Sequence, residues 1–273
     1  AAPAITPIET NRDKQSEFLT EIQNTEVSPI EPVFVDFSKD MSKGSVAEGI
    51  ELLYKKNETN DITTLTSVFD RGNQDDPRLG LAFDYLSYLG TPTRSAEQIK
   101  KELYELACFQ RLSCGTTQSY IGVSGLDENV GKAMDIVEDL IFNAQPDTVI
   151  LAELKSDIFK TRSDNKLSQG ACFGALRRYL FYGPDYIKKA TLTNEQVAAL
   201  TSEELLQAIR DLYGKKHDVL YYGPSGEAAA KKMIAEHHKT SETPESLVRS
   251  YPQARQVASS EVFIAPYDAN QFY

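Results

Sequence analysis

The chain has 273 residues, of which 41% are hydrophobic and 25% charged, and its formal net charge is −11. These values are typical of a folded globular protein. The acidic balance argues against nucleic acid, whose phosphates are bound by clustered Lys and Arg. No apolar run reaches the roughly 18 residues of a membrane helix. We therefore expect neither nucleic acid nor a membrane as a partner.

The first 45 residues predict an interdomain linker because they are rich in Pro, Thr, Glu and Asn. Residues 14–22 are compatible with a short helix. Residues 30–37 predict an extended run that crosses a domain surface. The side chains expected to hold this run in place are Val33, Val35 and Phe37.

Two strands and a helix are predicted at the start of the main domain, which we place at residues 46–240. The runs 50–56 and 62–69 alternate or are rich in β-branched residues, as strands are. In the helix that follows, Asp76 is a good N-cap and Pro77 fits the first helical position. Gly90 suits a left-handed C-terminal cap.

The remaining elements alternate in the same way. Capping boxes at Ser95 with Gln98 and at Thr201 with Glu204 predict two helix starts. The other expected elements are strands 109–114, 119–125 and 219–222, helices 130–141 and 227–238, and a helical region 147–181 broken near 165–170. This order predicts an α+β fold, a two-layer sandwich of a mostly antiparallel sheet with helices on one face.

Residues 241–273 predict a C-terminal linker followed by one lone strand, residues 261–268. A strand without a partner after it suggests the first strand of a following domain.

The helix ending in Leu89-Gly90-Thr91, with two strands before it and a Ser95-started helix after it, resembles the pitrilysin/insulinase family of zinc peptidases. Active members carry the inverted zinc motif H-x-x-E-H on this helix. Counting back from Gly90, the three catalytic positions of the motif correspond to Leu81, Asp84 and Tyr85. The resemblance implies a mitochondrial processing peptidase-like fold and a domain without the zinc motif, the third of four.

The histidine inventory argues against a zinc site independently of the resemblance. A catalytic zinc usually needs three protein ligands and an open position for water. The chain has only His217, in what looks like a turn, and the adjacent His237 and His238, which on a helix point about 100° apart. A solvated helix end is favoured over a stray metal site for this pair. We expect no catalytic, metal or cofactor-binding residues in this chain.

Three further features have two interpretations each. The resemblance places Glu153 at the third zinc ligand, with Lys160 where a second acid belongs, and we favour a surface acid for Glu153. Asp84 is either a relic of the general base or a structural cap, and we favour the cap. The run 177–186, Arg-Arg-Tyr-Leu-Phe-Tyr-Gly-Pro-Asp-Tyr, either binds an acidic peptide or closes the domain by aromatic packing, which we favour.

The three cysteines form no C-x-x-C pair. Cys108 and Cys114 lie six residues apart in or beside a strand, which spans roughly 20 Å, so a disulfide needs a bend in the chain. Buried free thiols are favoured for these two and for Cys172.

The function expected from this is a catalytically inactive scaffold or substrate-chamber domain of a zinc metalloendopeptidase. The alternative is a domain of a non-enzymatic structural subunit of the same superfamily. The resemblance implies that zinc is bound in the catalytic half of the parent protein, that the partners are the other domains of the same chain and an unfolded peptide substrate, and that the parent is periplasmic or otherwise extracytoplasmic. The sequence itself assigns no compartment.

Overall fold

The computed structural model describes residues 14–32, 34–265 and 267. The chain divides into two units, Ala1–Asp36 and Phe37–Tyr273, which are treated separately here. The first unit contains α1 (Glu17–Asn24). Ser16 caps this helix, since its side-chain oxygen accepts a hydrogen bond from the backbone N–H of Leu19 at 3.2 Å. The short helix predicted near the N-terminus is therefore confirmed.

The extended run that follows α1 has exposed apolar side chains, since Val35 is 63% exposed and Phe37 is 71% exposed. Their anchoring on a domain surface stays a prediction, because the run joins the two units that are described separately. Val33 lies outside the described residues.

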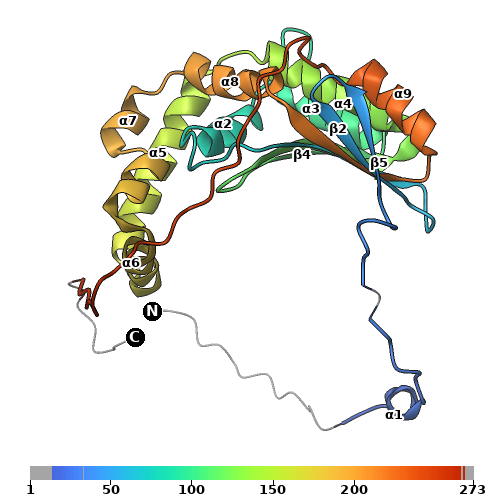
Figure 1. Ribbon diagram of the computed structural model, residues 1–273, viewed down its shortest axis with the longest axis horizontal. Helices are drawn as coiled ribbons and strands as arrows, with labels where there is room; N and C mark the ends of the chain where they lie inside the picture. The colour runs from blue at the N-terminus through green and yellow to red at the C-terminus, as the bar shows by residue number, and fades with distance from the viewer. Residues whose placement is uncertain (1–13, 33, 266, 268–273) are drawn as a thin grey trace, which may run out of the picture. The chain divides into compact units, whose positions relative to one another are not determined.

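The second unit is built on one six-stranded sheet with the order β1-β2-β6-β3-β5-β4 (Figure 1). The strands are β1 (Ser42–Ala47), β2 (Ile50–Lys56), β3 (Ile62–Phe69), β4 (Cys108–Cys114), β5 (Ser119–Leu126) and β6 (His217–Gly223). All neighbouring pairs are antiparallel except β2 and β6, which run parallel. The predicted mostly antiparallel α+β fold is confirmed.

The edge strand β1 was not predicted, and it begins inside the stretch expected to be linker. Its sequence Ser-Lys-Gly-Ser-Val-Ala has little β propensity, so only its pairing with β2 makes it a strand. Gly49 makes the turn between the two strands with φ of 71°, a conformation that favours glycine.

The helices lie on one face of the sheet, as predicted (Figure 1). Those in contact with the strands are α2 (Leu79–Leu86), α3 (Ala96–Glu105), α4 (Asp127–Asn143) and α9 (Glu227–His237). Strand side chains alternate between this face and the opposite one, which we call the open face. Phe109, Leu220 and Tyr222 on the open face are 55%, 39% and 43% exposed.

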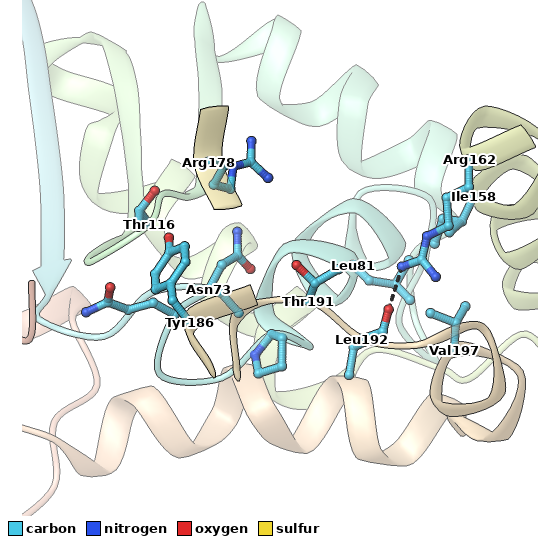
Figure 2. Close-up of a pocket in the computed structure, with 13 residues that line it drawn as sticks. Asn73, Leu81, Thr116, Ile158, Arg162, Arg178, Tyr186, Thr191, Leu192 and Val197 are labelled. Atoms are coloured by element: carbon cyan, nitrogen blue, oxygen red, sulfur yellow. Dashed lines mark hydrogen bonds between the residues drawn. The ribbon is translucent and has the colours of Figure 1, made fainter. Parts of the chain in front are cut away.

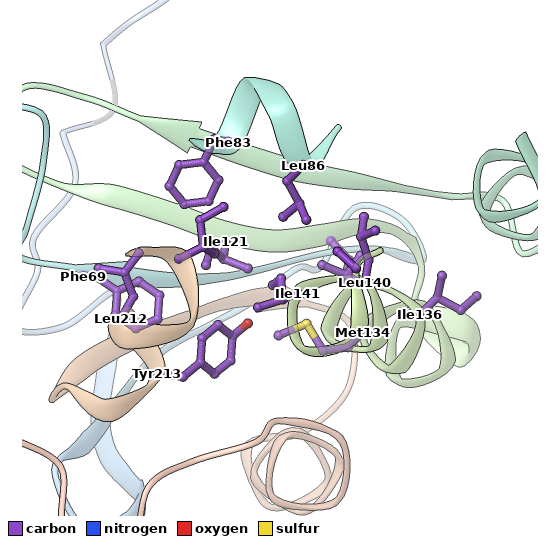
Figure 3. Close-up of a cluster of buried hydrophobic side chains, with 14 of the residues drawn as sticks. Phe69, Phe83, Leu86, Ile121, Met134, Ile136, Leu140, Ile141, Leu212 and Tyr213 are labelled. Atoms are coloured by element: carbon purple, nitrogen blue, oxygen red, sulfur yellow. The ribbon is translucent and has the colours of Figure 1, made fainter. Parts of the chain in front are cut away.

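The main core lies between the sheet and α2, α4 and α8 (Ser202–Arg210) (Figure 3). Helix α4 carries the predicted apolar stripe, in which Val130, Met134, Val137 and Ile141 are all at most 1% exposed. From the sheet, Ile121 and Phe69 contribute fully buried side chains.

A helical arm extends beyond the sheet. It consists of α5 (Thr148–Lys166), α6 (Gln169–Ala190) and α7 (Asn194–Ala199), and α8 with the short 3-10 helix η1 (Asp211–Gly214) leads from it to β6. The predicted break between the two long helices is confirmed. Helix α6 is kinked at Gly183, where φ is 77°, just before Pro184. Helix α7 was not predicted, although Thr193 and Gln196 form a capping box at its start.

The C-terminal segment does not form the lone strand predicted for residues 261–268, since none of the described residues 261–265 and 267 is in a strand. The backbone there has no partner strand, and side-chain contacts take its place. Phe263 packs edge-on against Tyr179 of α6 at a ring distance of 5.8 Å, and the N–H of Arg255 donates to the carbonyl of Phe181. No helix in the described residues is long and apolar enough to cross a membrane.

Candidate functional site

The candidate site is built around α2, the helix on which the resemblance places the zinc motif. Asp76, the predicted N-cap, lies before the first residue of α2 and does not cap the helix. Its carboxylate accepts hydrogen bonds from Arg78, at 3.1 Å from the backbone N and 2.7 Å from Nη2. Burial alone raises the pKa of Asp76, but these hydrogen bonds outweigh it and leave the pKa below its ordinary value. Helix α2 itself begins at Leu79 without a side-chain cap.

The end of α2 also differs from the prediction. The helix ends at Leu86, and Gly90 is not left-handed, since Gly49 and Gly183 are the described glycines with positive φ. Glycine is needed at position 90 for another reason. A Cβ there would lie 2.4 Å from the carbonyl oxygen of Arg94, which is closer than any real contact.

At the three motif positions on α2, Tyr85 and Leu81 pack in or against the core, whereas Asp84 does not form the structural cap that was favoured from the sequence. Tyr85 is fully buried, and its hydroxyl contacts the backbone N and O of Asp147 at 2.7 and 2.9 Å and Ser202 Oγ at 2.9 Å. Leu81 is only half-buried against the core. Asp84 is exposed and has no hydrogen bond through its carboxylate among the described residues, while partial burial raises its pKa.

These side chains do not fit a zinc ion. Leu81 has no atom that could bind a metal, the Tyr85 hydroxyl is already engaged, and Asp84 is the single carboxylate among the three positions. Glu153 and Lys160 are both exposed on α5. In the part of the chain that the structure describes, no three His, Cys, Asp or Glu side chains come together as ligands. The absence of a catalytic site remains a prediction that these observations do not test.

A cavity of about 400 Å³ lies where Leu81 faces the helical arm (Figure 2). Its lining comes from the loop before α2, from α2 itself, from α5 and α6, and from the segment that leads to α7. The lining residues are Asn73, Gln74, Pro77, Leu81, Thr116, Ile158, Arg162, Arg178, Tyr186, Ala190, Thr191, Leu192 and Val197. The only ionisable groups in that set are two arginines and a tyrosine, although the chain as a whole carries a net charge of −11.

The two arginines differ in their partners. Arg162 donates to Asn194 Oδ1 at 2.6 Å and to the carbonyl of Leu192 at 2.8 Å, and both of these acceptors are uncharged. Arg178 is exposed and forms no hydrogen bond or ion pair with any residue that the structure describes. Within the part of the chain that the structure describes, no carboxylate therefore pairs with either guanidinium.

A second polar group in the same lining lacks a partner. Gln74 is only 4% exposed, and its Nε2 donates to Ser250 Oγ at 2.5 Å, whereas its Oε1 is buried without a hydrogen bond. A buried acceptor left unpaired is costly. The sequence analysis gave no signal for Gln74, and it found Arg178 only as part of the run 177–186.

His217 and His238 form a buried chain of hydrogen bonds with Glu138 of α4 at the start of β6. His217 Nε2 lies 2.8 Å from His238 Nε2, and His238 Nδ1 lies 2.6 Å from Oε1 of Glu138 on α4. His217 and His238 are 5% and 6% exposed, and Glu138 is fully buried. The predictions of a turn for His217 and of a solvated helix end for His238 are wrong, because pairing with Glu138 lets both rings enter the core.

The hydrogen-bond partners determine how protons are placed in this chain. His217 Nδ1 is 2.8 Å from the carbonyl of Lys215, which can only accept, so Nδ1 carries the proton and Nε2 accepts from His238. The other carboxylate oxygen of Glu138 accepts a hydrogen bond from the Lys239 N–H at 2.8 Å. Burial lowers the pKa of His217 to about 4, with His238 acting in the same direction, so His217 is neutral at pH 7.

The cysteines are free thiols, as favoured from the sequence. Cys108 is buried while Cys114 and Cys172 are half-buried. Burial raises the pKa of the Cys108 and Cys114 thiols, so neither is activated as a nucleophile.

The six-stranded sheet with helices on one face is the fold of M16 peptidase domains. M16 peptidases are the pitrilysin-type peptidases. The sequence matches no family model and no curated protein. Among solved structures, the chain is similar to the inactive domain of an M16 peptidase from Pseudomonas fluorescens, with a TM-score of 0.63 and 15% identity over 78% of this chain and 54% of that one.

Two longer structures are also similar. One is the periplasmic protease PqqL from Escherichia coli, with a TM-score of 0.65 and 19% identity over 89% of this chain and 30% of PqqL. The other is a mutant of the ferredoxin protease FusC in complex with Arabidopsis ferredoxin, with a TM-score of 0.66 and 12% identity over 93% of this chain and 28% of FusC. The chain thus has the M16 domain fold and spans less than two thirds of each of these proteins.

Proposed function

We propose that this chain is a catalytically inactive scaffold domain of a larger M16-type peptidase. The observation that supports the proposal is which residues stand on α2. In this M16 domain fold, Leu81, Asp84 and Tyr85 stand where the resemblance places the zinc motif, and the Tyr85 hydroxyl is hydrogen-bonded to Asp147 and Ser202. In this proposal zinc is bound by the catalytic half of the parent protein, and this chain, the third of four domains, contributes no metal ligand.

The role that we propose is to form one wall of a chamber that accepts unfolded peptides. The open face of the sheet supports it, because helices leave that face uncovered and it presents Phe109, Leu220 and Tyr222. Exposed aromatic and aliphatic side chains on an uncovered face are typical of an interaction surface. The other domains of the same parent chain are the proposed partners.

The experiment that tests the proposal compares the natural chain with a restored one. The purified chain should contain no stoichiometric zinc and should not hydrolyse unfolded peptides, because three ligands do not converge at α2. Leu81→His, Asp84→Glu and Tyr85→His together should also leave it inactive. The triple variant removes the Tyr85 hydroxyl from Asp147, and Lys160 lies on α5 where the resemblance places a supporting acid.

One tightly bound zinc per unmodified chain, together with cleavage that a chelator abolishes, would overturn the proposal. Reading the upstream part of the parent sequence separates the two forms of the proposal. An H-x-x-E-H motif there means a peptidase, and its absence means a non-enzymatic structural subunit.

A further inference from the structure

The cavity beside α2 has the charge of a binding site for an anion. It is lined by Arg162 and Arg178 and by no acidic residue, in a chain with 40 Asp and Glu against 29 Lys and Arg. An arginine on an acidic protein ordinarily meets a carboxylate at the surface, as Arg94 does with Glu102 and Asp139. Arg178 has no such partner among the described residues, although its guanidinium presents several donors.

The cavity also has an apolar side. The side chains of Leu81, Ile158 and Val197 in its lining suit the carbon atoms next to a carboxylate. A peptide with a carboxylate combines both features.

Figure 2 shows that the labelled polar groups come from different segments of the chain and surround the same space. Arg178 of α6, Thr116 of the turn after β4, and Asn73 of the loop before α2 lie around Leu81 and Thr191. Arg162 is held in the lining by its hydrogen bonds to Leu192 and Asn194, which are both uncharged acceptors, so its positive charge stays near the cavity.

We infer that this cavity binds a peptide through a carboxylate, with Arg178 contacting the carboxylate oxygens and Arg162 adding positive charge to the lining. The inference rests on the proposed function only in taking peptides as the ligand class. The carboxylate comes either from an acidic side chain or from a peptide C-terminus, and the experiment distinguishes the two. In this inference the peptide passes over α2 at the place of the missing zinc motif and is held there without being cut.

The test is a titration followed through the arginine side chains. The chain is labelled with ¹⁵N-arginine, and the Nε–H signal of Arg178 is identified by its loss in Arg178→Gln. Three capped peptides are added in turn: acetyl-Gly-Ala-Glu-Ala-Gly-amide, the same peptide with Gln in place of Glu, and the Gln peptide with a free C-terminal carboxylate. The Kd of each is measured with the natural chain and with Arg178→Gln.

The expected result is saturable binding of at least one carboxylate peptide, with the Gln amide at least about tenfold weaker. Arg178→Gln should raise the Kd of the bound peptide about tenfold, as expected for a lost hydrogen bond between charged groups. The matched control is Arg177→Gln, which removes the neighbouring exposed arginine that does not line the cavity and should change the Kd less than twofold. Thermal melting of both variants checks that the fold is kept.

Each other outcome overturns the inference in a distinct way. If Glu and Gln peptides bind equally well and Arg178→Gln has no effect, peptides bind elsewhere on the chain and the proposed function survives without this cavity. If Arg177→Gln weakens binding as much as Arg178→Gln, the effect is general charge and not this site. If no peptide binds, both the inference and the peptide-chamber role fail.

Discussion

The buried position of His217 makes the stability of the chain fall in mild acid, and the amount can be worked out from the structure. In the unfolded chain His217 has an ordinary pKa of about 6.5. In the folded chain burial lowers its pKa to about 4. Between these values the unfolded chain binds a proton that the folded chain does not, so the free energy of unfolding decreases as the pH falls from about 6.5 to about 4.

Each pH unit in this window costs about 1.4 kcal/mol, so lowering the pH from 7 to 5 should cost about 2 kcal/mol from this group alone. The perturbation that isolates it is His217→Gln. A glutamine amide reaches about as far as imidazole Nε2, so it can accept the His238 N–H without titrating. The natural chain should therefore lose about 2 kcal/mol more than His217→Gln between pH 7 and pH 5.

The assay is urea unfolding followed by far-UV circular dichroism at pH 7, 6 and 5. His237→Gln is the matched control, because His237 is a neighbouring ring that contacts Asp135 at 2.9 Å at the surface and lies outside the buried chain of hydrogen bonds. That variant should keep the pH dependence of the natural chain. Equal losses in the natural chain and in His217→Gln would refute the reasoning, since His217 would then titrate alike in both states.

Two further predictions concern α2. Tyr85→Phe should lower the free energy of unfolding by about 1–3 kcal/mol, because the half-buried N–H of Asp147 loses its acceptor. Tyr88→Phe at an exposed position should have no measurable effect, and equal values for the two variants in urea unfolding would contradict the contact of Tyr85 with Asp147. Leu86→Ala should lower the free energy of unfolding by about 2–5 kcal/mol, because Leu86 is fully buried. Leu81→Ala should lower it clearly less, because Leu81 is half-buried beside the cavity. A larger loss for Leu81→Ala than for Leu86→Ala would mean that the cavity beside Leu81 is closed.

The elements of the fold could largely be predicted from the sequence, whereas their pairing could not. Strands β2 and β3 follow each other in sequence and carry clear β patterns, but they are not neighbours in the sheet, because β6 lies between them. Periodicity reports which face of an element is apolar and contains no information about the strand on either side. The edge strand β1 was missed for a related reason, since its residues have low β propensity and only β2 makes them a strand.

The motif positions on α2 could be predicted from the sequence, whereas the buried pairing of His217 with His238 could not. The spacing from Gly90 led to Leu81, Asp84 and Tyr85, and the structure places all three on α2. The pairing of His217 with His238 depends on strand and helix ends that are 21 residues apart and meet only in the folded chain. One signal was present: Glu138 follows Val137 on the apolar stripe of α4, four residues after Met134, and an acid at such a position indicates a buried partner.

The position of β6 has a consequence for how the chain folds. This strand is made last, after residue 216, yet it lies third of six in the sheet and bonds to both β2 and β3. During synthesis the earlier strands therefore form two separate pieces, β1 with β2 and β3 with β5 and β4, each with a strand edge open to other chains. The two pieces join only when the last strand emerges, and pairing β6 with β2 closes a loop of more than 150 residues between Lys56 and His217. A chain cut short before His217 should therefore aggregate after its release from the ribosome.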